Sequence, residues 1–128
     1  MFVLRLEDDM GNGPWSSGRG DAFVNCDVNH HYTNKCPNVF DDVEGLCSRQ
    51  CNYFCATQTP ELFNQWFPYP LRQAAEKAGY KAVIYKIHKN GVKFGQRQCV
   101  FNKKKAKIFA QFNPTDFKNI EAVMTPSS

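Results

Sequence analysis

Residues 80–101 read YKAVIYKIHKNGVKFGQRQCVF, and this stretch decides the fold class. Its first part alternates: Val83, Tyr85 and Ile87 fall at every second position, with Lys86 and His88 on the other face. Alternation with a period of two is typical of a strand that has one buried face. We therefore expect a half-buried strand in which Val83, Tyr85 and Ile87 face the core.

The middle of the same stretch carries a turn signal. Asn90-Gly91 supplies the positive φ values that a tight two-residue hairpin turn needs. The pattern predicts that residues 81–87 pair antiparallel with a returning strand over residues 92–101. Gly95 falls inside the returning strand, where an isolated glycine indicates a β-bulge.

Two further strands and two helices are predicted on the N-terminal side of this hairpin. Residues 2–6 alternate and residues 52–57 form a short run, so both read as strands. Thr59-Pro60-Glu61 is a helix start, with Thr as N-cap and Pro at the first helical position, and it opens a helix over residues 60–67. A second helix over residues 70–78 ends before Gly79, a good C-cap.

The remaining segments complete an α+β prediction. Residues 10–22 form a Gly-rich loop, residues 23–50 show no sustained period, and residues 106–112 read as a last strand or the start of a helix. The expected fold is a small, twisted, mostly antiparallel sheet with two short helices and a long irregular N-terminal half. The chain has 128 residues, which fits one domain over residues 1–123 and a tail over residues 124–128.

Composition places the chain among globular proteins and excludes a disordered one. It is 42% hydrophobic and 14% aromatic, with 11 Phe, and its net charge is +4. The N-terminal segment is not typical of a signal peptide, and no window approaches the roughly 18 apolar residues of a spanning helix. We therefore expect a cytoplasmic protein whose six Cys are reduced thiols.

The Cys and His residues could form a zinc site, although this is not the favoured reading. Cys47 and Cys51 are separated by three residues, Cys26 and His30 have the same spacing, and Cys55 continues the series. Zinc takes four such ligands, but structural sites are mostly built on a compact two-residue knuckle that is missing here. The preferred reading is that these Cys are small apolar residues. A Cys–His nucleophile has no local signature, and it is disfavoured.

A lysine cluster follows the predicted hairpin. It consists of Lys103, Lys104, Lys105 and Lys107, with further cations on the hairpin itself. Lysines beside exposed aromatics bind single-stranded nucleic acid in many proteins. The alternative is an ordinary solvated turn or protection of a strand edge, and the alternative is preferred at this stage.

The chain as a whole resembles a loose set of small phage and prophage proteins. The motifs that carry the resemblance run from Leu4-Arg5-Leu6-Glu7 and Gly11-Asn12-Gly13-Pro14-Trp15, through Cys36-Pro37-Asn38, Asp41-Asp42, Thr59-Pro60-Glu61 and Trp66-Phe67, to Gly95-Gln96-Arg97-Gln98-Cys99-Val100-Phe101. Each motif is short, but together they cover most of the chain. The resemblance implies a phage-encoded protein that acts on a host system.

The order of elements is also similar to the small ADP-ribosyltransferase fold. In that fold a first-strand Arg grips a phosphate of NAD, a later strand ends in Ser or Thr beside the nicotinamide ribose, and a final hairpin strand carries a catalytic Glu. The matching positions here are Arg5, Thr57 or Thr59, and Gln98. The resemblance implies mono-ADP-ribosyl transfer from NAD to a host macromolecule, with Arg5, Thr59 and Gln98 as the catalytic set.

The same resemblance implies a binding set for NAD. Arg5 would hold the pyrophosphate with its planar fork of donors, Thr57 would lie beside the ribose, and Trp15 or Tyr53 would stack on the nicotinamide ring. Gln98 departs from the family pattern, because an amide offers no negative charge to an oxocarbenium-like ribose. The alternative is structural: Arg5 pairs with a surface acid, Thr59 only caps a helix, and Gln98 satisfies a strand edge.

Two rival functions remain open from the sequence. The first is a non-catalytic anti-defence inhibitor that binds a host protein through the irregular Cys-rich region. The second is a small accessory protein that binds nucleic acid through the lysine cluster.

Overall fold

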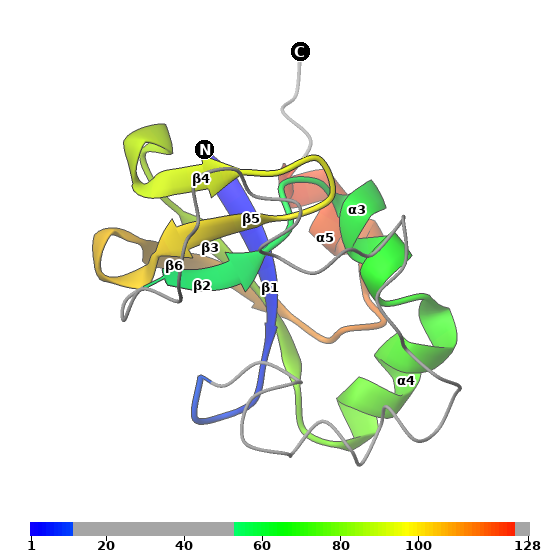
Figure 1. Cartoon of the computed structure of the whole chain (residues 1–128). Helices are drawn as coiled ribbons and strands as arrows, with labels where there is room; N and C mark the ends of the chain where they lie inside the picture. Colours follow the sequence, from blue (N-terminus) through cyan, green and yellow to red (C-terminus); the bar gives the residue numbers. More distant parts are fainter. Residues whose placement is uncertain (12–52, 125–128) are drawn as a thin grey trace.

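The computed structural model describes residues 1–11 and 53–124 (Figure 1). Within these residues the chain forms six strands, three α-helices and two single-turn 3-10 helices. In chain order they are β1 (Phe2–Glu7), β2 (Tyr53–Ala56), α3 (Pro60–Trp66), α4 (Tyr69–Lys77), β3 (Lys81–Lys86), η1 (Lys89–Gly91), β4 (Val92–Phe94), β5 (Cys99–Asn102), η2 (Lys103–Lys105), β6 (Lys107–Phe112) and α5 (Phe117–Met124).

The strands form two antiparallel three-stranded sheets, with the orders β1-β3-β6 and β2-β5-β4. One pair of residues joins the sheets: Leu4 N donates to Thr57 O and Thr57 N donates to Leu4 O, both at 2.9 Å. Helices lie beside the sheets and do not alternate with parallel strands (Figure 1). The predicted α+β class with a mostly antiparallel sheet is therefore confirmed.

The predicted pairing of residues 81–87 with 92–101 is wrong. Strand β3 pairs with β1 and β6, whereas β4 pairs with β5, and η1 carries the chain from one sheet to the other. Asn90 and Gly91 form part of this 3-10 turn, in which Gly91 N donates to His88 O at 2.9 Å. A Cβ on Gly91 would lie 3.0 Å from the Ile87 Cδ1 atom, so the glycine serves close packing here.

The hairpin that the chain does form lies one strand later. Strands β4 and β5 pair antiparallel, and Gly95 N donates to Gln98 O at 2.8 Å across the connecting turn. Gly95 is therefore a turn residue and not the bulge that the sequence predicted. The bulge of this fold lies between β3 and β6, where the register shifts between Ile84 and Tyr85.

Strand β3 is buried on both faces, which corrects the expectation of a half-buried strand. Val83, Tyr85 and Ile87 face the core as predicted, in a cluster shared with the second sheet. Ala82 and Ile84 are also buried, in a separate cluster shared with the helices. A strand that lies between a sheet and a helical layer has no solvent face, so the residues at its other alternate positions are core residues too.

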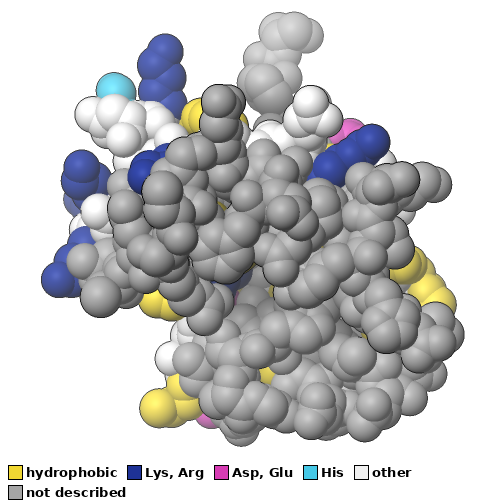
Figure 2. All heavy atoms as spheres, in the orientation of Figure 1, with side chains coloured by type: hydrophobic (Ala, Val, Ile, Leu, Met, Phe, Trp, Pro, Cys, Tyr) yellow, Lys and Arg dark blue, Asp and Glu magenta, His cyan; other side chains and the backbone are white. Residues whose placement is uncertain are grey.

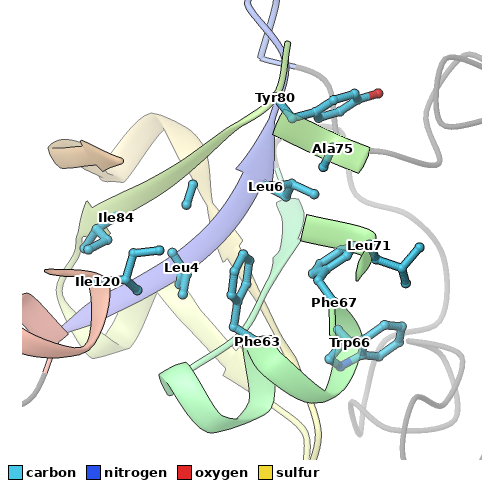
Figure 3. Close-up of a cluster of buried hydrophobic side chains, with 11 residues drawn as sticks. Leu4, Leu6, Phe63, Trp66, Phe67, Leu71, Ala75, Tyr80, Ile84 and Ile120 are labelled. Carbon is cyan, nitrogen blue, oxygen red and sulfur yellow. The ribbon is translucent and has the colours of Figure 1, made fainter. Parts of the chain in front are cut away.

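The helices α3 and α4 confirm their sequence signals. Thr59 Oγ1 accepts from Leu62 N at 3.1 Å, as an N-cap does. Helix α4 ends at Lys77, two residues before Gly79, which has a φ of 91°. Figure 3 shows Phe63 and Leu71 from these helices in the same cluster as Leu4 of β1.

Helix α5 was not predicted. Asp116, a favoured N-cap residue, directly precedes Phe117, so a start signal was present, but no glycine ends the segment. In the structure Ile120 is fully buried beside Leu4 and Ile84, as Figure 3 shows. Tertiary packing of this one side chain, with Val123 and Met124 partly buried behind it, accounts for the helix.

Candidate functional site

Arg5, the predicted pyrophosphate ligand, lies inside the protein and is bound by protein groups. Its side chain is on the face of β1 that looks toward the second sheet, because Val3 of that face packs there. Arg5 Nε donates to Glu7 Oε2 at 2.8 Å, and Arg5 Nη1 donates to the Cys55 carbonyl at 2.8 Å. Its guanidinium also lies over the Phe54 ring, 5.0 Å from the centroid.

Glu7 accepts from three side chains around it. The Tyr85 hydroxyl lies 2.8 Å from both carboxylate oxygens, and Lys103 Nζ lies 2.8 Å from Oε2, the oxygen that Arg5 also binds. Burial and the Glu7 carboxylate raise the pKa of Tyr85, so this phenol stays protonated and donates. We refer to Arg5, Glu7, Tyr85 and Lys103 as the Glu7 cluster.

The alternative prediction for Arg5, an ion pair with an acid, is confirmed, although the acid is the buried Glu7 and not a surface residue. A local signal for this pair was present in the sequence. Arg5 and Glu7 are two residues apart on a strand, so they share a face, and alternating opposite charges on a buried strand indicate an internal ion pair. Tyr85 and Lys103 arrive from β3 and from η2, and only the fold shows that they meet.

The other predicted NAD-site residues lie around the junction of β2 and α3. Thr57 is buried, and its hydroxyl donates to Leu4 O at 3.3 Å, while Thr59 caps α3. Gln98 is buried at the end of the β4–β5 turn, and Gln58 Nε2 reaches the same turn by donating to Gly95 O at 3.0 Å. The strand of Arg5, this junction and the turn of Gln98 are therefore neighbours.

Several predicted residues lie outside the described part of the chain. Trp15 and the zinc candidates Cys26, His30, Cys47 and Cys51 belong to residues 12–52, as does most of the Cys-rich region that was assigned to host-protein binding. Tyr53 is the first residue of β2. Within residues 1–11 and 53–124 no three His, Cys, Asp or Glu side chains are grouped so that they could hold a metal ion.

The fold brings further lysines beside the predicted lysine cluster. Lys104 and Lys105 of η2 are exposed, and Asn102 Oδ1 accepts from Lys104 N at 3.1 Å, which fixes the turn. Turn η1 lies against η2, because a Cβ on Gly91 would be 3.5 Å from Lys105 Cδ. The exposed Lys89 of η1 thereby joins the η2 lysines.

The adjoining strands add two more exposed lysines. Lys86 at the end of β3 is the register partner of Lys107 at the start of β6. Figure 2 shows Lys or Arg side chains and one His gathered at the left of the molecule, where Figure 1 draws the turns before β4 and after β5. We call this surface the basic end; it consists of Lys86, His88, Lys89, Lys104, Lys105 and Lys107.

Lys103 differs from its neighbours in η2. Its ammonium turns inward to Glu7, donates to Gly11 O at 3.3 Å, and lies 4.9 Å from the centroid of the Phe54 ring. The predicted set of four lysines therefore divides by role. Lys103 anchors the turn to β1, whereas Lys104, Lys105 and Lys107 face outward.

A charge pattern in the sequence indicates the basic end more clearly than the lysine run does. Residues 77–115 contain ten Lys or Arg and no Asp or Glu. The rest of the chain then has six Lys or Arg against twelve Asp or Glu, so the modest net charge of +4 hides one strongly basic segment in an otherwise acidic chain. The acid-free segment spans β3 to β6, and it therefore builds the whole basic end.

A pocket of about 400 Å³ lies at the opposite end of β3, around Lys81. Gln111, Phe112, Asn113 and Asp116 line the rest of it, and Lys81 Nζ donates to Asn113 Oδ1 at 2.8 Å. Arg5, Thr57, Thr59 and Gln98, the predicted nucleotide-site residues whose side chains are described, do not line this pocket. Among the helices that the structure describes, none has the length and apolar character needed to span a membrane.

Comparison with known proteins gives one match. The model of the family described as bacteriophage T4 Y00F protein matches residues 1–115 of the chain. No curated protein matches, and no solved structure matches. Because the family match covers most of the sequence, from β1 through β6, it confirms the resemblance to phage proteins and carries no ADP-ribosyltransferase assignment. The chain belongs to the bacteriophage T4 Y00F protein family, a family of phage proteins.

Proposed function

We propose that this phage protein binds nucleic acid through the basic end. The observation that supports the proposal is the gathering of five exposed lysines from three separate places, namely the end of β3, η1, and the segment from η2 into β6. The phosphate backbone of a nucleic acid carries closely spaced negative charges. Lysines that neutralise phosphates release condensed counterions, and this release drives association.

The arrangement differs from that of an ordinary solvated turn in one respect. Lys86 and Lys107 lie directly opposite each other on neighbouring antiparallel strands. Like charges in this relation repel and destabilise a sheet. A bound phosphate would relieve the repulsion between these two exposed ammonium groups.

The turns that carry the lysines are held in shape before any ligand binds. Asn102 caps η2, and His88 Nδ1 accepts from Asn90 N at 3.2 Å in η1. Lys103 ties η2 to β1 through the buried Glu7. A surface that is already ordered loses less conformational entropy on binding.

The test is binding of a fluorescein-labelled 20-nucleotide strand, followed by anisotropy at several salt concentrations. Replacing Lys104 and Lys105 by Gln should weaken binding, and it should reduce the slope of log K against log salt by about 1.4, since each phosphate contact on a single strand contributes about 0.7. Lys77→Gln on α4 is the matched control, an exposed lysine away from the basic end. Equal losses in the control and the double variant would contradict the proposal.

A second candidate is NAD binding with ADP-ribosyl transfer to a host macromolecule. The observation in its favour is that the strand of Arg5, the Thr57–Thr59 junction and the turn of Gln98 lie together. Thr59 at the start of α3 and the Cys55 carbonyl beside Arg5 border the same region. Gln98 is neutral, so the arrangement supports holding a ribose hydroxyl more than it supports bond cleavage.

This candidate has its own experiment. NAD that binds the folded protein must raise its melting temperature by linkage, and calorimetry gives the affinity directly. Gln98→Glu would restore the carboxylate of the transferase pattern, and the appearance of NAD hydrolysis in that variant would support the candidate. Absence of any heat of binding with millimolar NAD would exclude this candidate. The same result would not affect the proposal that the basic end binds nucleic acid.

A further inference from the structure

We infer that the nucleic acid bound at the basic end is single-stranded, and that one base stacks on Phe109 while Lys86 and Lys107 hold the flanking phosphates. The inference rests on the proposed function and specifies its ligand. The four residues involved, Phe2, Lys86, Lys107 and Phe109, are called the aromatic platform below.

Register places three members of the platform in one row. Phe2 of β1 is the partner of Lys86 on β3, and Lys86 is the partner of Lys107 on β6. Residues directly opposite each other in antiparallel strands project from the same face of the sheet. An aromatic ring and two exposed ammonium groups therefore lie side by side across the end of the sheet β1-β3-β6.

The fourth member, Phe109, is brought to this row by a β-bulge. Ile108 pairs with Tyr85 and Ala110 pairs with Ile84, so Phe109 is the extra residue at the irregularity. A bulge changes the direction in which a side chain points, so the side chain no longer follows the alternation of its strand. The Phe109 ring lies 4.7 Å from the Phe2 ring, centroid to centroid, at an interplanar angle of 49°. Phe109 nevertheless remains 52% exposed, so the residue is accessible to a ligand.

The chemistry of the platform selects single strands. A base in a duplex has both faces covered by its neighbours, and only an unpaired base can stack on a protein ring. Stacking depends little on sequence because every base has a π-face. The opposed lysines, Lys86 and Lys107, supply the phosphate contacts on either side of the stacked base. Among the described strands β6 lies at the edge of its sheet, which leaves room for the nucleic-acid strand to pass.

An exposed Phe on an edge strand also fits a protein ligand, such as an acidic segment pairing with β6. The observations favour nucleic acid because the bulge interrupts the regular ladder beside Phe109, and an added strand needs a regular ladder. Acidic polypeptide is therefore kept as an outcome of the test.

The experiment compares three ligands of equal length and charge per strand: a 12-nucleotide oligothymidine, the same strand with abasic sites throughout, and a duplex of the 12-mer. We expect the oligothymidine to bind the wild type about tenfold more tightly than the abasic strand. Phe109→Leu should remove this advantage while leaving the affinity for the abasic strand unchanged, and Phe109→Trp should retain it. Tyr69→Leu, which changes a similarly exposed aromatic on α4, is the control and should have no effect.

The results show whether the aromatic platform fails alone or whether the proposed function fails with it. Binding of none of the three ligands overturns both the platform and the proposed function. Equal binding of all three, with no effect of Phe109→Leu, overturns the platform while the basic end stands as a general polyanion site. Polyglutamate that binds as tightly as oligothymidine, and loses affinity in Phe109→Leu, assigns the platform to an acidic protein ligand and overturns the inference. An unchanged melting temperature in Phe109→Leu confirms that any loss is a loss of contact.

Discussion

Replacing Glu7 by Gln tests whether the Glu7 cluster stabilises the junction of the two sheets. The variant keeps the shape of the side chain and removes its charge. In the wild type the carboxylate accepts from Arg5 and Lys103, which are cationic, and from the Tyr85 hydroxyl, all at 2.8 Å. Glu7 is buried, so water does not replace what the variant loses.

The magnitude follows from these contacts. Removing one partner of a buried ion pair costs about 3–5 kcal/mol, because the other partner is left buried and unpaired. The side chain of Lys103 is 27% exposed and regains part of its hydration, whereas that of Arg5 is 8% exposed and does not. We therefore expect the lower end of the range, a loss of about 3 kcal/mol in the free energy of unfolding.

Urea denaturation at neutral pH, followed by tryptophan fluorescence and circular dichroism, measures this loss. Glu121→Gln is the control, because Glu121 is exposed on α5 and its replacement should stay within about 0.5 kcal/mol of the wild type. A double-mutant cycle with Lys103→Gln should give a coupling energy of about 1 kcal/mol or more. A cost below about 1 kcal/mol for Glu7→Gln, or no coupling to Lys103, would refute the assignment of the cluster.

Three further predictions concern stability. Thr59→Ala removes the acceptor for Leu62 N and should cost about 1 kcal/mol in a urea titration, whereas Thr59→Ser should cost little, and equal losses would argue against the cap. Gly79→Ala should cost about 1 kcal/mol by the same assay because Gly79 has a φ of 91°; a Cβ there meets no neighbouring atom within 4 Å, so any larger loss would be unexplained. Burial raises the pKa of Cys99 above its ordinary value of 9.0, and burial with Glu7 raises that of Tyr85 above 10.0, so both groups ionise first in the unfolded chain. The contribution of these two groups to the free energy of unfolding should be constant below about pH 9. It should fall as the pH rises, by up to about 1.4 kcal/mol per pH unit for the thiol, and Cys99→Ala should flatten this fall in unfolding curves measured between pH 8 and 11.

The sequence by itself determined the elements whose signals are local. Thr59-Pro60 placed the start of α3, Gly79 placed the end of α4, and alternation marked β1 and β3 as strands. These signals work because a cap, a fixed φ or a side-chain period acts within a few residues of its own position. The buried side chains Val83, Tyr85 and Ile87 were predicted for the same reason.

Local signals could not determine which strands are neighbours. Asn90-Gly91 suits a hairpin turn, but β3 gains two long partners, β1 and β6, by entering a different sheet from β4. Six ladder positions with β1 and five with β6 outweigh the preference of one dipeptide for its turn. Helix α5 also depends on contacts that are distant in the sequence, because Ile120 is buried against strands β1 and β3.

The candidate sites divide in the same way. The lysine run was visible in the sequence, because consecutive charges need no fold to be recognised. Only the tertiary structure turned Lys103 inward to Glu7, brought Lys86 opposite Lys107, and placed Phe109 against Phe2. Each of these contacts joins residues that are 21 or more positions apart in the chain. The free energy that favours these contacts comes from burying the two hydrophobic clusters between which β3 lies.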